Sequence, residues 1–482
     1  MARIAVLVLI AMAGLIAPAH ADVTISSQAT SNMSCSSGVC TPTATDAVLN
    51  TADLETMLAS GNVEVTTTGS GVQATDIDVT AGVTWASSGV LSLVAYHSIA
   101  VGQAIAVDGA GGLGIVTNNG GSGGIFSFGP GANVSFLDLA SALTINGAAY
   151  TLENSVATLA SAIKVNSAGN YALANNYDAS NEGTYSHSPI KVAFSGDFEG
   201  LGNTISNLSV SGGGNRRLVY IALFARLNGG QPGAKIENII LQNVNIGGHG
   251  FVAAGLVGVN GGTIQGSFVS GSVSSDYYHN GGPGQGLLAG YNAGTIALSG
   301  AVGTVRSRRS SLAGGLAEYN AGSIIQSYAN CTVSGGKGSD MGALVSENEG
   351  AIAQSYAMGT IKGGGGSYVG GLVGVNATES RITQAYSTAT VKRFSGGYRG
   401  GMIGADYSPD GRNSSDYWDL STSDVIRPDH GAGNIKNDPG ITGLTTTQLQ
   451  SGLPAGFDPT IWAQNPGIND GFPYLIANPP VK

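Results

Sequence analysis

An asparagine recurs at nearly constant spacing through the middle of this chain, and this repeat restricts the possible fold more than any other feature. The copies are Asn260, Asn292, Asn320, Asn348 and Asn376, and Asp406 follows in the same frame, at intervals of 32, 28, 28, 28 and 30 residues. Most copies close a short apolar run of the form Gly-Leu-Val-Gly-x-Asn, as at residues 255–260 and 371–376. A period of this size indicates that one small unit is stacked repeatedly, because no single unit can bury its apolar face alone.

Two more columns of residues recur in the same frame. Aromatic residues follow the asparagine by eight or ten positions, and β-branched residues follow five positions later. These are Phe268, Tyr328, Tyr356 and Tyr386, and then Val273, Val305, Val333, Ile361 and Val391. Each unit therefore contains three short strands and three turns, which predicts an all-β chain folded as a right-handed parallel β-helix with like residues ~4.8 Å apart on successive coils. Helical repeats are disfavoured, because several glycines in each unit would cost roughly 1 kcal/mol apiece inside helices.

The asparagine column has a structural explanation within such a solenoid. Side-chain amides stacked in register can donate to one neighbouring coil and accept from the other. We therefore interpret these asparagines as a structural ladder at a turn or in the interior, and not as a binding site.

The first 21 residues are typical of an export signal. Arg3 is followed by an apolar run over residues 4–16, and Ala19-His20-Ala21 has the small-residue spacing of a cleavage site. A membrane anchor is the weaker interpretation, since thirteen apolar residues fall short of the ~20 that span a bilayer as a helix. No later segment is long and apolar enough to span a membrane, so we expect no transmembrane segment after cleavage.

The sequence divides into three further regions. Residues 22–165 form a β-rich N-terminal domain that includes short helices at 51–61 and 154–163, the second with Asn154 able to cap its start. Residues 166–406 form the repeat region. Residues 407–482 lose the repeat and gain large aromatic side chains, which predicts a small C-terminal cap that covers the strand edges of the last coil.

Charge and cysteine content narrow the function classes. The formal net charge is -10, which argues against nucleic acid as a partner and against electrostatic anchoring to an anionic membrane. Cys35 and Cys40 are close in sequence, and export makes a disulfide between them plausible. Cys331 is expected to be a small buried residue, and no set of residues has metal-ligand spacing. We expect no metal and no cofactor.

The repeats resemble the GLUG repeat of bacterial surface proteins. The resemblance covers roughly residues 171–478 and depends on the Gly-Leu-Val-Gly-x-Asn copies, on the segment 194–208, and on the closing Tyr417-Trp418-Asp419 with Leu444-Thr445-Thr446. The N-terminal region, through residues 49–55 and 128–134, is similar to filamentous-haemagglutinin-type exoproteins. The resemblance implies a secreted or cell-surface bacterial adhesin, associated with the outer membrane, with a β-helical shaft. It implies export either by a two-partner route, with a separate outer-membrane transporter as a partner, or by an autotransporter route. It supplies no catalytic residues.

Catalytic and metal motifs were tested directly. Gly248-His249-Gly250 resembles one element of polygalacturonases, but the aspartate cluster that such chemistry needs is absent from the sequence. Residues 335–341 match the start of a calcium-binding nonapeptide, yet a single copy cannot share ions between turns. Residues 109–114 fit Gly-x-Gly-x-x-Gly without the helix and acidic residue of a nucleotide site. We therefore expect no enzymatic activity.

Two irregular segments are the candidate binding loops. One carries Tyr277, Tyr278 and His279, and the other carries the basic residues Arg306, Arg308 and Arg309. Loop tips that vary between repeats are common places for recognition, although solvated turns are the default for such residues.

The sequence thus predicts a non-catalytic attachment protein that contacts glycans or a host or abiotic surface through many weak contacts along a rigid rod. Two other functions remain open. A carbohydrate-active β-helix enzyme, a hydrolase or a lyase, would bring carboxylates from neighbouring coils together on one face. A purely structural surface or matrix protein would not need such a cluster of carboxylates.

Overall fold

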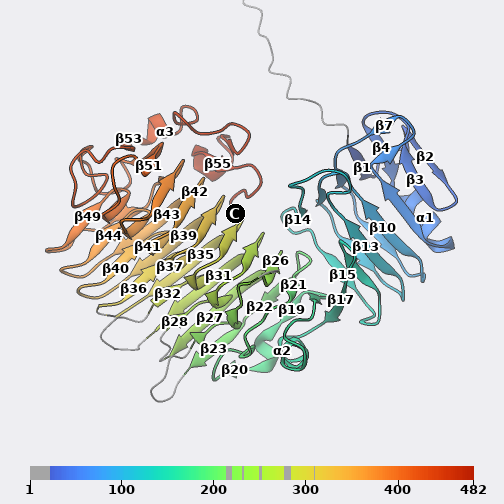
Figure 1. The fold of residues 1–482 in the computed structure, drawn as a ribbon, viewed down its shortest axis with the longest axis horizontal. Helices are drawn as coiled ribbons and strands as arrows, with labels where there is room; N and C mark the ends of the chain where they lie inside the picture. The colour runs from blue at the N-terminus through green and yellow to red at the C-terminus, as the bar shows by residue number, and fades with distance from the viewer. Residues whose placement is uncertain are drawn as a thin grey trace, which may run out of the picture.

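The computed structural model describes residues 22–212, 220–230, 233–248, 252–275, 284–308 and 310–481. They form a β-solenoid in which almost all strand pairs are parallel, with only short helices (Figure 1). One sheet of 16 strands runs through the molecule from β2 (Met33–Ser36) to β51 (Asn413–Ser414). The all-β parallel solenoid predicted from the repeat is confirmed.

Each repeat coil contains four short strands where the sequence predicted three. One coil comprises β36 (Leu312–Gly314), β37 (Ala317–Asn320), β38 (Ser323–Ile325) and β39 (Tyr328–Ser334). The predicted Leu-Val strand is divided into β36 and β37 by a bend at Gly315. A Cβ atom at Gly315 would collide with the carbonyl group of Ala343 on the next coil, so only glycine allows this close approach.

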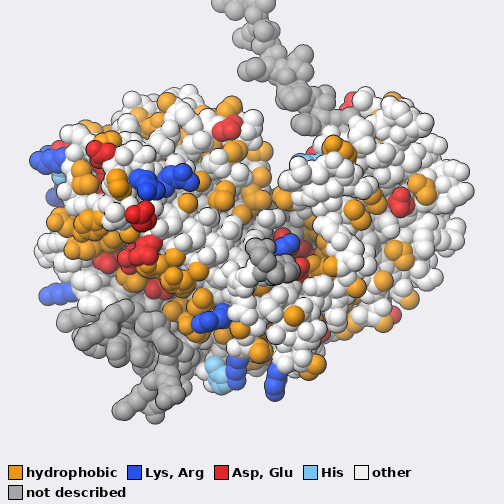
Figure 2. Space-filling view, in the orientation of Figure 1, with side chains coloured by type: hydrophobic (Ala, Val, Ile, Leu, Met, Phe, Trp, Pro, Cys, Tyr) orange, Lys and Arg blue, Asp and Glu red, His pale blue; other side chains and the backbone are white. Residues whose placement is uncertain are grey.

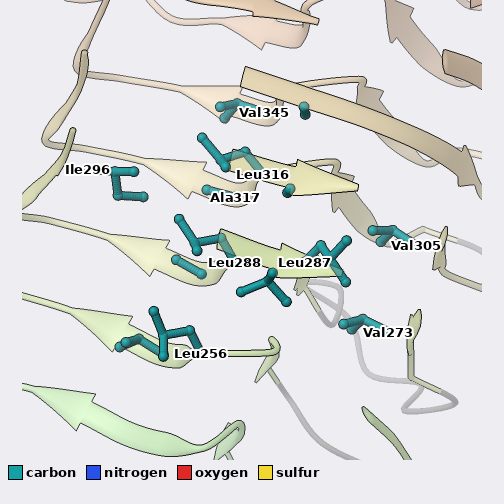
Figure 3. Close-up of a cluster of buried hydrophobic side chains, with 14 of the residues drawn as sticks. Leu256, Val273, Leu287, Leu288, Ile296, Val305, Leu316, Ala317 and Val345 are labelled. Carbon is teal, nitrogen blue, oxygen red and sulfur yellow. The ribbon is translucent and has the colours of Figure 1, made fainter. Parts of the chain in front are cut away.

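The coils pair in register, and this places like residues in interior columns. Ile324 lies opposite Ile296 and Ile352, and Val333 lies opposite Val305 and Ile361. All six side chains are almost fully buried. Figure 3 shows leucines and valines of successive coils pointing into the same interior. Each coil therefore supplies the apolar cover that its neighbour needs.

A hairpin divides the solenoid into two stacks of coils. β16 (Leu143–Ile145) and β17 (Ala148–Glu153) pair antiparallel, whereas the flanking strands of the same sheet pair in parallel. Asn146 and Gly147 between them both have positive φ, 49° and 81°, as a two-residue type I′ turn requires. The strand direction consequently reverses at this point of the sheet.

The two stacks share the sheet near this hairpin and bury both of its faces. In β18 (Tyr171–Leu173), Tyr171 and Leu173 belong to the C-terminal core, while Ala172 between them belongs to the N-terminal core. Successive side chains of a strand point to opposite faces, so this strand separates the two interiors. The arrangement joins the two stacks along a common wall.

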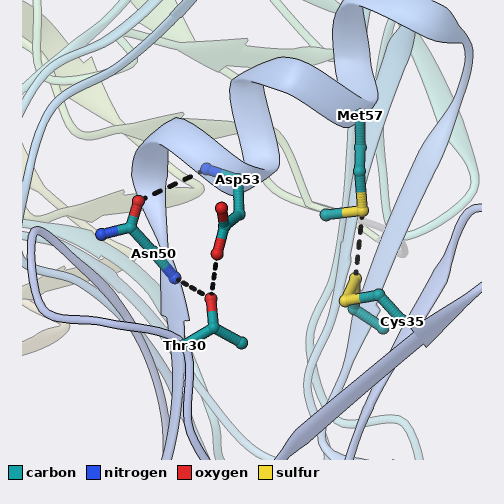
Figure 4. Close-up of a disulfide and its surroundings, with 6 residues drawn as sticks. Thr30, Cys35, Asn50, Asp53 and Met57 are labelled. Carbon is teal, nitrogen blue, oxygen red and sulfur yellow. Dashed lines mark hydrogen bonds between the residues drawn. A yellow bond between two sulfur atoms is a disulfide. The ribbon is translucent and has the colours of Figure 1, made fainter.

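The two ten-residue helices cover different cores, because the buried residues of α1 belong to the N-terminal core and those of α2 belong to the C-terminal core. In α1 (Thr51–Ser60) the side chain of Asn50 accepts hydrogen bonds from the backbone of Ala52 and Asp53 (Figure 4). In α2 (Val156–Val165) the cap is Ser155, whose Oγ accepts from Thr158 N at 3.1 Å. The predicted cap, Asn154, lies one residue before it.

The C-terminal region has two parts, which lie in different places on the solenoid. Its first part closes the end of the core, where Trp418 and Ile441 join the interior cluster and β53 (Ile441–Leu444) adds one strand beyond β52 (Asp416–Asp419). Residues 449–481 then fold back along the outside of the coils. The bulky aromatic residues that the sequence analysis expected over the last coil therefore lie mainly on the side of the solenoid.

Candidate ligand-binding face

The asparagine ladder lies inside the solenoid and is fully buried. Asn260 Nδ2 donates to Asn292 Oδ1, and the same bond links each later pair, at 2.7, 2.7, 2.7 and 2.9 Å. The series ends where Asn376 Nδ2 donates to Asp406 Oδ1 at 3.2 Å. All five asparagines are 0% exposed, so their side chains are unavailable to a ligand.

Cys35 and Cys40 form a disulfide across the hairpin of β2 and β3 (Val39–Pro42) at the N-terminal edge of the long sheet. Met57 of α1 packs on it, with 4.0 Å between Met57 Sδ and Cys40 Sγ (Figure 4). The bond therefore ties the first hairpin at the place where α1 covers it. Cys331 is a free, buried thiol in β39.

Most residues of the two candidate binding loops lie outside the described part of the chain, and the others do not form a site. Tyr277, Tyr278, His279 and Arg309 lie outside the described residues, as do His249 and Gly250. Arg306 ends β35 (Gly300–Arg306) with an exposed side chain. The backbone carbonyl of Arg308 accepts hydrogen bonds from Ser339 Oγ at 2.9 Å and from Gly336 N at 3.1 Å. These contacts fix the turn but do not form a site.

A different surface brings chemically active side chains together, at the bend that separates the first two strands of each coil. The outer faces of these strands approach each other there, since a Cβ atom at Gly374 of one coil would lie 2.7 Å from Met341 N of the coil before it. Two columns of side chains flank this bend. One holds Leu312, Asp340, Tyr368 and Tyr398, and the other holds Tyr291, Tyr319, Glu347 and Val375.

We call the tyrosines and carboxyl groups of these columns the aromatic–acidic face; they are Tyr291, Tyr319, Asp340, Glu347, Tyr368 and Tyr398. Tyr291 and Tyr319 stack with ring centroids 5.0 Å apart, and Tyr368 and Tyr398 stack at 5.3 Å. Figure 2 shows acidic and apolar or aromatic side chains side by side over this part of the solenoid. The face runs over at least five coils.

The carboxyl groups of the face influence one another. Burial, and then the neighbouring charge of Glu347, raise the pKa of Asp340 to about 6. Burial and the charge of Glu349 raise the pKa of Glu347 itself. Within the part of the chain that the structure describes, no Lys or Arg forms an ion pair with either residue. The described residues therefore place no cation in ion-pair contact with this negative charge.

Glu318 lies beneath these side chains, next to Gly284. Its side chain is 7% exposed, and its Oε2 has no hydrogen-bond partner. A Cβ atom on Gly284 would collide with its carboxyl group, so the glycine makes room for it. Burial, followed by the charge of Glu347, raises the pKa of Glu318 to about 8. The group is therefore mostly protonated and uncharged at neutral pH.

This face was not among the sites predicted from the sequence. Its signal was present in the position directly before each ladder asparagine, which is occupied by Val259, Tyr291, Tyr319, Glu347 and Val375. Variation at one fixed position of a stacked repeat marks a surface column. The partner column lies on the other side of the bend, and its proximity could not be known before β36 and β37 were seen as separate strands.

A second carboxyl cluster lies where the two stacks meet, and its contacts are structural. Glu199 accepts hydrogen bonds from Leu201 N at 2.8 Å and from Asn238 Nδ2 at 3.2 Å, and Asn238 also donates to the carbonyl oxygen of Phe126. Burial and the charge of Glu237 raise the pKa of Glu199 well above its usual range. These contacts join the C-terminal stack to the N-terminal one.

Two features, a membrane-spanning helix and a metal site, are absent from the described residues. None of the described helices is long and apolar enough to cross a membrane. No group of three or more His, Cys, Asp or Glu among the described residues has an arrangement that could hold a metal ion.

Comparison with known proteins gives one sequence motif and several remote structural likenesses, two of which are described below. Residues 365–392 match the GLUG motif, and no curated protein matches the chain. An IgA1 protease structure is 23% identical with a TM-score of 0.39, covering 54% of this chain and 20% of its own, so this chain spans about a fifth of that one. A Bacteroides ovatus protein, assigned provisionally as an immunoglobulin A1 protease, is 16% identical with a TM-score of 0.38, covering 69% of this chain and 93% of its own. Both likenesses are too remote to inform function. The chain is thus a β-solenoid that contains the GLUG motif.

Proposed function

We propose that this protein is a secreted or cell-surface attachment protein that is not catalytic and that contacts glycans on an opposing surface. The GLUG motif within a β-solenoid suggests an extracellular protein. The aromatic–acidic face supports the attachment role, because it places tyrosine rings on four coils, on either side of one coil with two carboxyl groups, and so offers a series of weak contacts at the coil spacing of ~4.8 Å.

The experiment uses the organism that makes the protein. Deletion of the gene should reduce the number of cells attached to a glycan-coated surface, and the wild-type gene should restore it. A Tyr319→Ala gene should restore it only in part, while Tyr96→Ala, which removes an exposed tyrosine of the N-terminal stack, should restore it fully. Unchanged attachment after deletion would refute the proposal.

A polysaccharide-cleaving enzyme is the second candidate, and one observation favours it. Glu318 and Glu347 come from neighbouring coils, and the charge of Glu347 contributes to the raised pKa of both Glu318 and Asp340. A protonated carboxyl beside an ionised one is what glycoside hydrolysis needs. The burial of Glu318 opposes this function, since a general acid must reach the glycosidic oxygen. Release of reducing ends from polysaccharides by the wild-type protein, lost in Glu318→Gln, would establish the enzyme and exclude the non-catalytic proposal.

A further inference from the structure

The aromatic–acidic face has a distinct order along the solenoid. Glu347 follows Tyr319 in one column, and Tyr368 follows Asp340 in the other. The coil that carries Asp340 and Glu347 therefore lies between the stacked pair Tyr291–Tyr319 on one side and the stacked pair Tyr368–Tyr398 on the other. Each stacked pair therefore ends at this acidic coil, where Glu347 is the next residue in the column of Tyr319 and Asp340 is the next residue in the column of Tyr368.

The charges and rings around the acidic coil indicate that it would bind a cationic ligand. Aromatic ring faces carry partial negative charge and attract cations, most strongly where water is excluded. Asp340 and Glu347 add carboxylates, and their pKa values are raised by burial and by acidic neighbours, while none of the described Lys or Arg residues forms an ion pair with them. Tyr407, which forms a hydrogen bond with Tyr368, adds a third aromatic ring near Asp340.

The unpartnered carboxyl group of Glu318 is a second, independent observation that indicates a ligand site in this region. Its carboxyl group is more than nine-tenths buried, has an unpartnered Oε2, and is directed at Gly284, which belongs to the same column as Asp340. An unpartnered buried carboxyl group is unfavourable, so natural proteins seldom retain one without a reason. Glu318 lies in the same strand as Tyr319, on the coil next to the acidic coil.

We propose that the aromatic–acidic face binds a polysaccharide whose sugars carry free ammonium groups. The ammonium groups pair with Asp340 and Glu347, and sugar rings pack against the outer edges of the tyrosines in the stacks on either side. This inference rests on the proposed attachment function and specifies its ligand class. The sugar repeat of a β-linked chain is close to the coil spacing, so one chain can meet successive coils.

Other glycans fit the face less well. An uncharged chain could accept and donate hydrogen bonds but could not offset the uncompensated carboxylates. A uronic-acid chain would add like charges to them, which is unfavourable at short range. The amino-sugar chain alone combines a ring that packs on tyrosine with a cation for the carboxylates.

The test measures binding of three probes to the full secreted chain by isothermal titration calorimetry at pH 6.0 and low salt. The probes are the β-1,4-linked hexamer of glucosamine, the same hexamer fully N-acetylated, and polygalacturonate. We expect the glucosamine hexamer to bind at least about tenfold more tightly than its acetylated form, and polygalacturonate not to bind, because only the first probe brings cations.

The variant Asp340→Asn/Glu347→Gln should weaken glucosamine-hexamer binding by about tenfold or more. A matched control, Glu64→Gln/Asp108→Asn, removes the same charge from exposed positions of the N-terminal stack and should leave binding unchanged. Equal thermal melting of the two variants would show that both are folded.

Proton release gives a readout that a structural role would not produce. A bound cation lowers the pKa values of neighbouring carboxyl groups, so binding at pH 6.0 should release protons from Asp340, and the observed heat should change with the ionisation enthalpy of the buffer. Equal affinity for both hexamers, or no loss in the Asp340→Asn/Glu347→Gln variant, would overturn the inference. If attachment of cells still depends on Tyr319 in that case, the attachment function stands and only the ligand class is wrong.

Discussion

Asn320 Nδ2 donates two hydrogen bonds, to Asn348 Oδ1 at 2.7 Å and to the carbonyl oxygen of Ala351 at 3.2 Å. Its own Oδ1 accepts from Asn292 Nδ2 at 2.7 Å. Each interior amide therefore joins its coil to both neighbours, whereas the last position of the ladder only needs to accept. Asp406, which accepts from Asn376 through Oδ1 and from Asn413 through Oδ2, meets that requirement.

Replacing one amide in the middle of the ladder should destabilise the solenoid. Asn320→Ala removes three hydrogen bonds and leaves Asn348 Oδ1 and the carbonyl of Ala351 buried without that donor. We expect the free energy of unfolding to fall by about 2–4 kcal/mol, measured by urea denaturation. Asn330→Ala, at an exposed position of the same coil, should change it by less than about 0.5 kcal/mol. Equal effects of the two substitutions would show that the ladder does not stabilise the coils.

Gln285 is a polar residue in an apolar column, and its replacement should stabilise the protein. It is 0% exposed, neither its Oε1 nor its Nε2 has a hydrogen-bond partner among the described residues, and the corresponding residues of nearby coils include Ala253, Ala313 and Met341. Gln285→Met keeps a similar volume and removes two unsatisfied polar atoms. We expect a gain of about 1–3 kcal/mol in the free energy of unfolding, measured by denaturation beside Gln103→Met at an exposed turn. A loss of stability in Gln285→Met would mean that the amide has an unrecognised partner.

The parts of this structure that follow from periodicity could be predicted from the sequence. A fixed interval between asparagines gives the stacking of coils, and the β-branched column gives the interior, because every coil repeats the same burial. The hairpin at Asn146-Gly147 has a local turn signal, but its consequence, a sheet buried on both faces at Tyr171 and Ala172, depends on which sheet the second stack joins. Nothing in the local sequence specifies that choice.

The aromatic–acidic face could not be predicted from the sequence, for a related reason. Asp340 and Glu347 are seven residues apart and look like two solvated acidic residues of a turn and a strand. They become neighbours of each other only because the chain bends tightly between the first two strands of each coil. The tightness of that bend depends on backbone contacts between different coils, as at Gly315 and Ala343, and a repeat period alone does not give such contacts.

The raised pKa of Glu318 predicts a specific dependence of stability on pH. The folded group titrates at about 8, above the ordinary value of 4.5. Between these values the unfolded chain has released the proton and the folded chain retains it, so the free energy of unfolding must fall as pH rises. The effect is on the order of 4 kcal/mol and is complete above about pH 8.

Glu318→Gln keeps the shape of the side chain and removes this titration. The variant should match or fall slightly below the wild type at pH 4.5 and should be more stable by a few kcal/mol at pH 8.5. Thermal unfolding of both proteins across this pH range, with Glu64→Gln as an exposed control, measures the difference. A constant difference between the variant and the wild type at all pH values would show that Glu318 has an ordinary pKa in the folded protein.

Residues 449–481 should detach from the solenoid without unfolding it when their main anchor is removed. Trp462 is 1% exposed, and its ring centroid lies 4.6 Å from that of Phe457 and 5.8 Å from that of Tyr386. Tyr386 also donates to the carbonyl oxygen of Pro473 at 2.6 Å. The anchor therefore holds the segment on a column of tyrosines whose own coils are stabilised independently by the interior.

Trp462→Ala should lower the stability of this attachment by about 3 kcal/mol, which raises the open population roughly a hundredfold. Limited proteolysis should then cut within residues 449–481 much faster than in the wild type, leaving a resistant fragment that contains the repeat coils. Ile476→Ala changes an exposed residue of the same segment and should leave the cleavage rate near that of the wild type. Simultaneous digestion of the segment and the coils would instead mean that the packed segment is part of the cooperative core, because a locally opening element is cut before the structure beneath it.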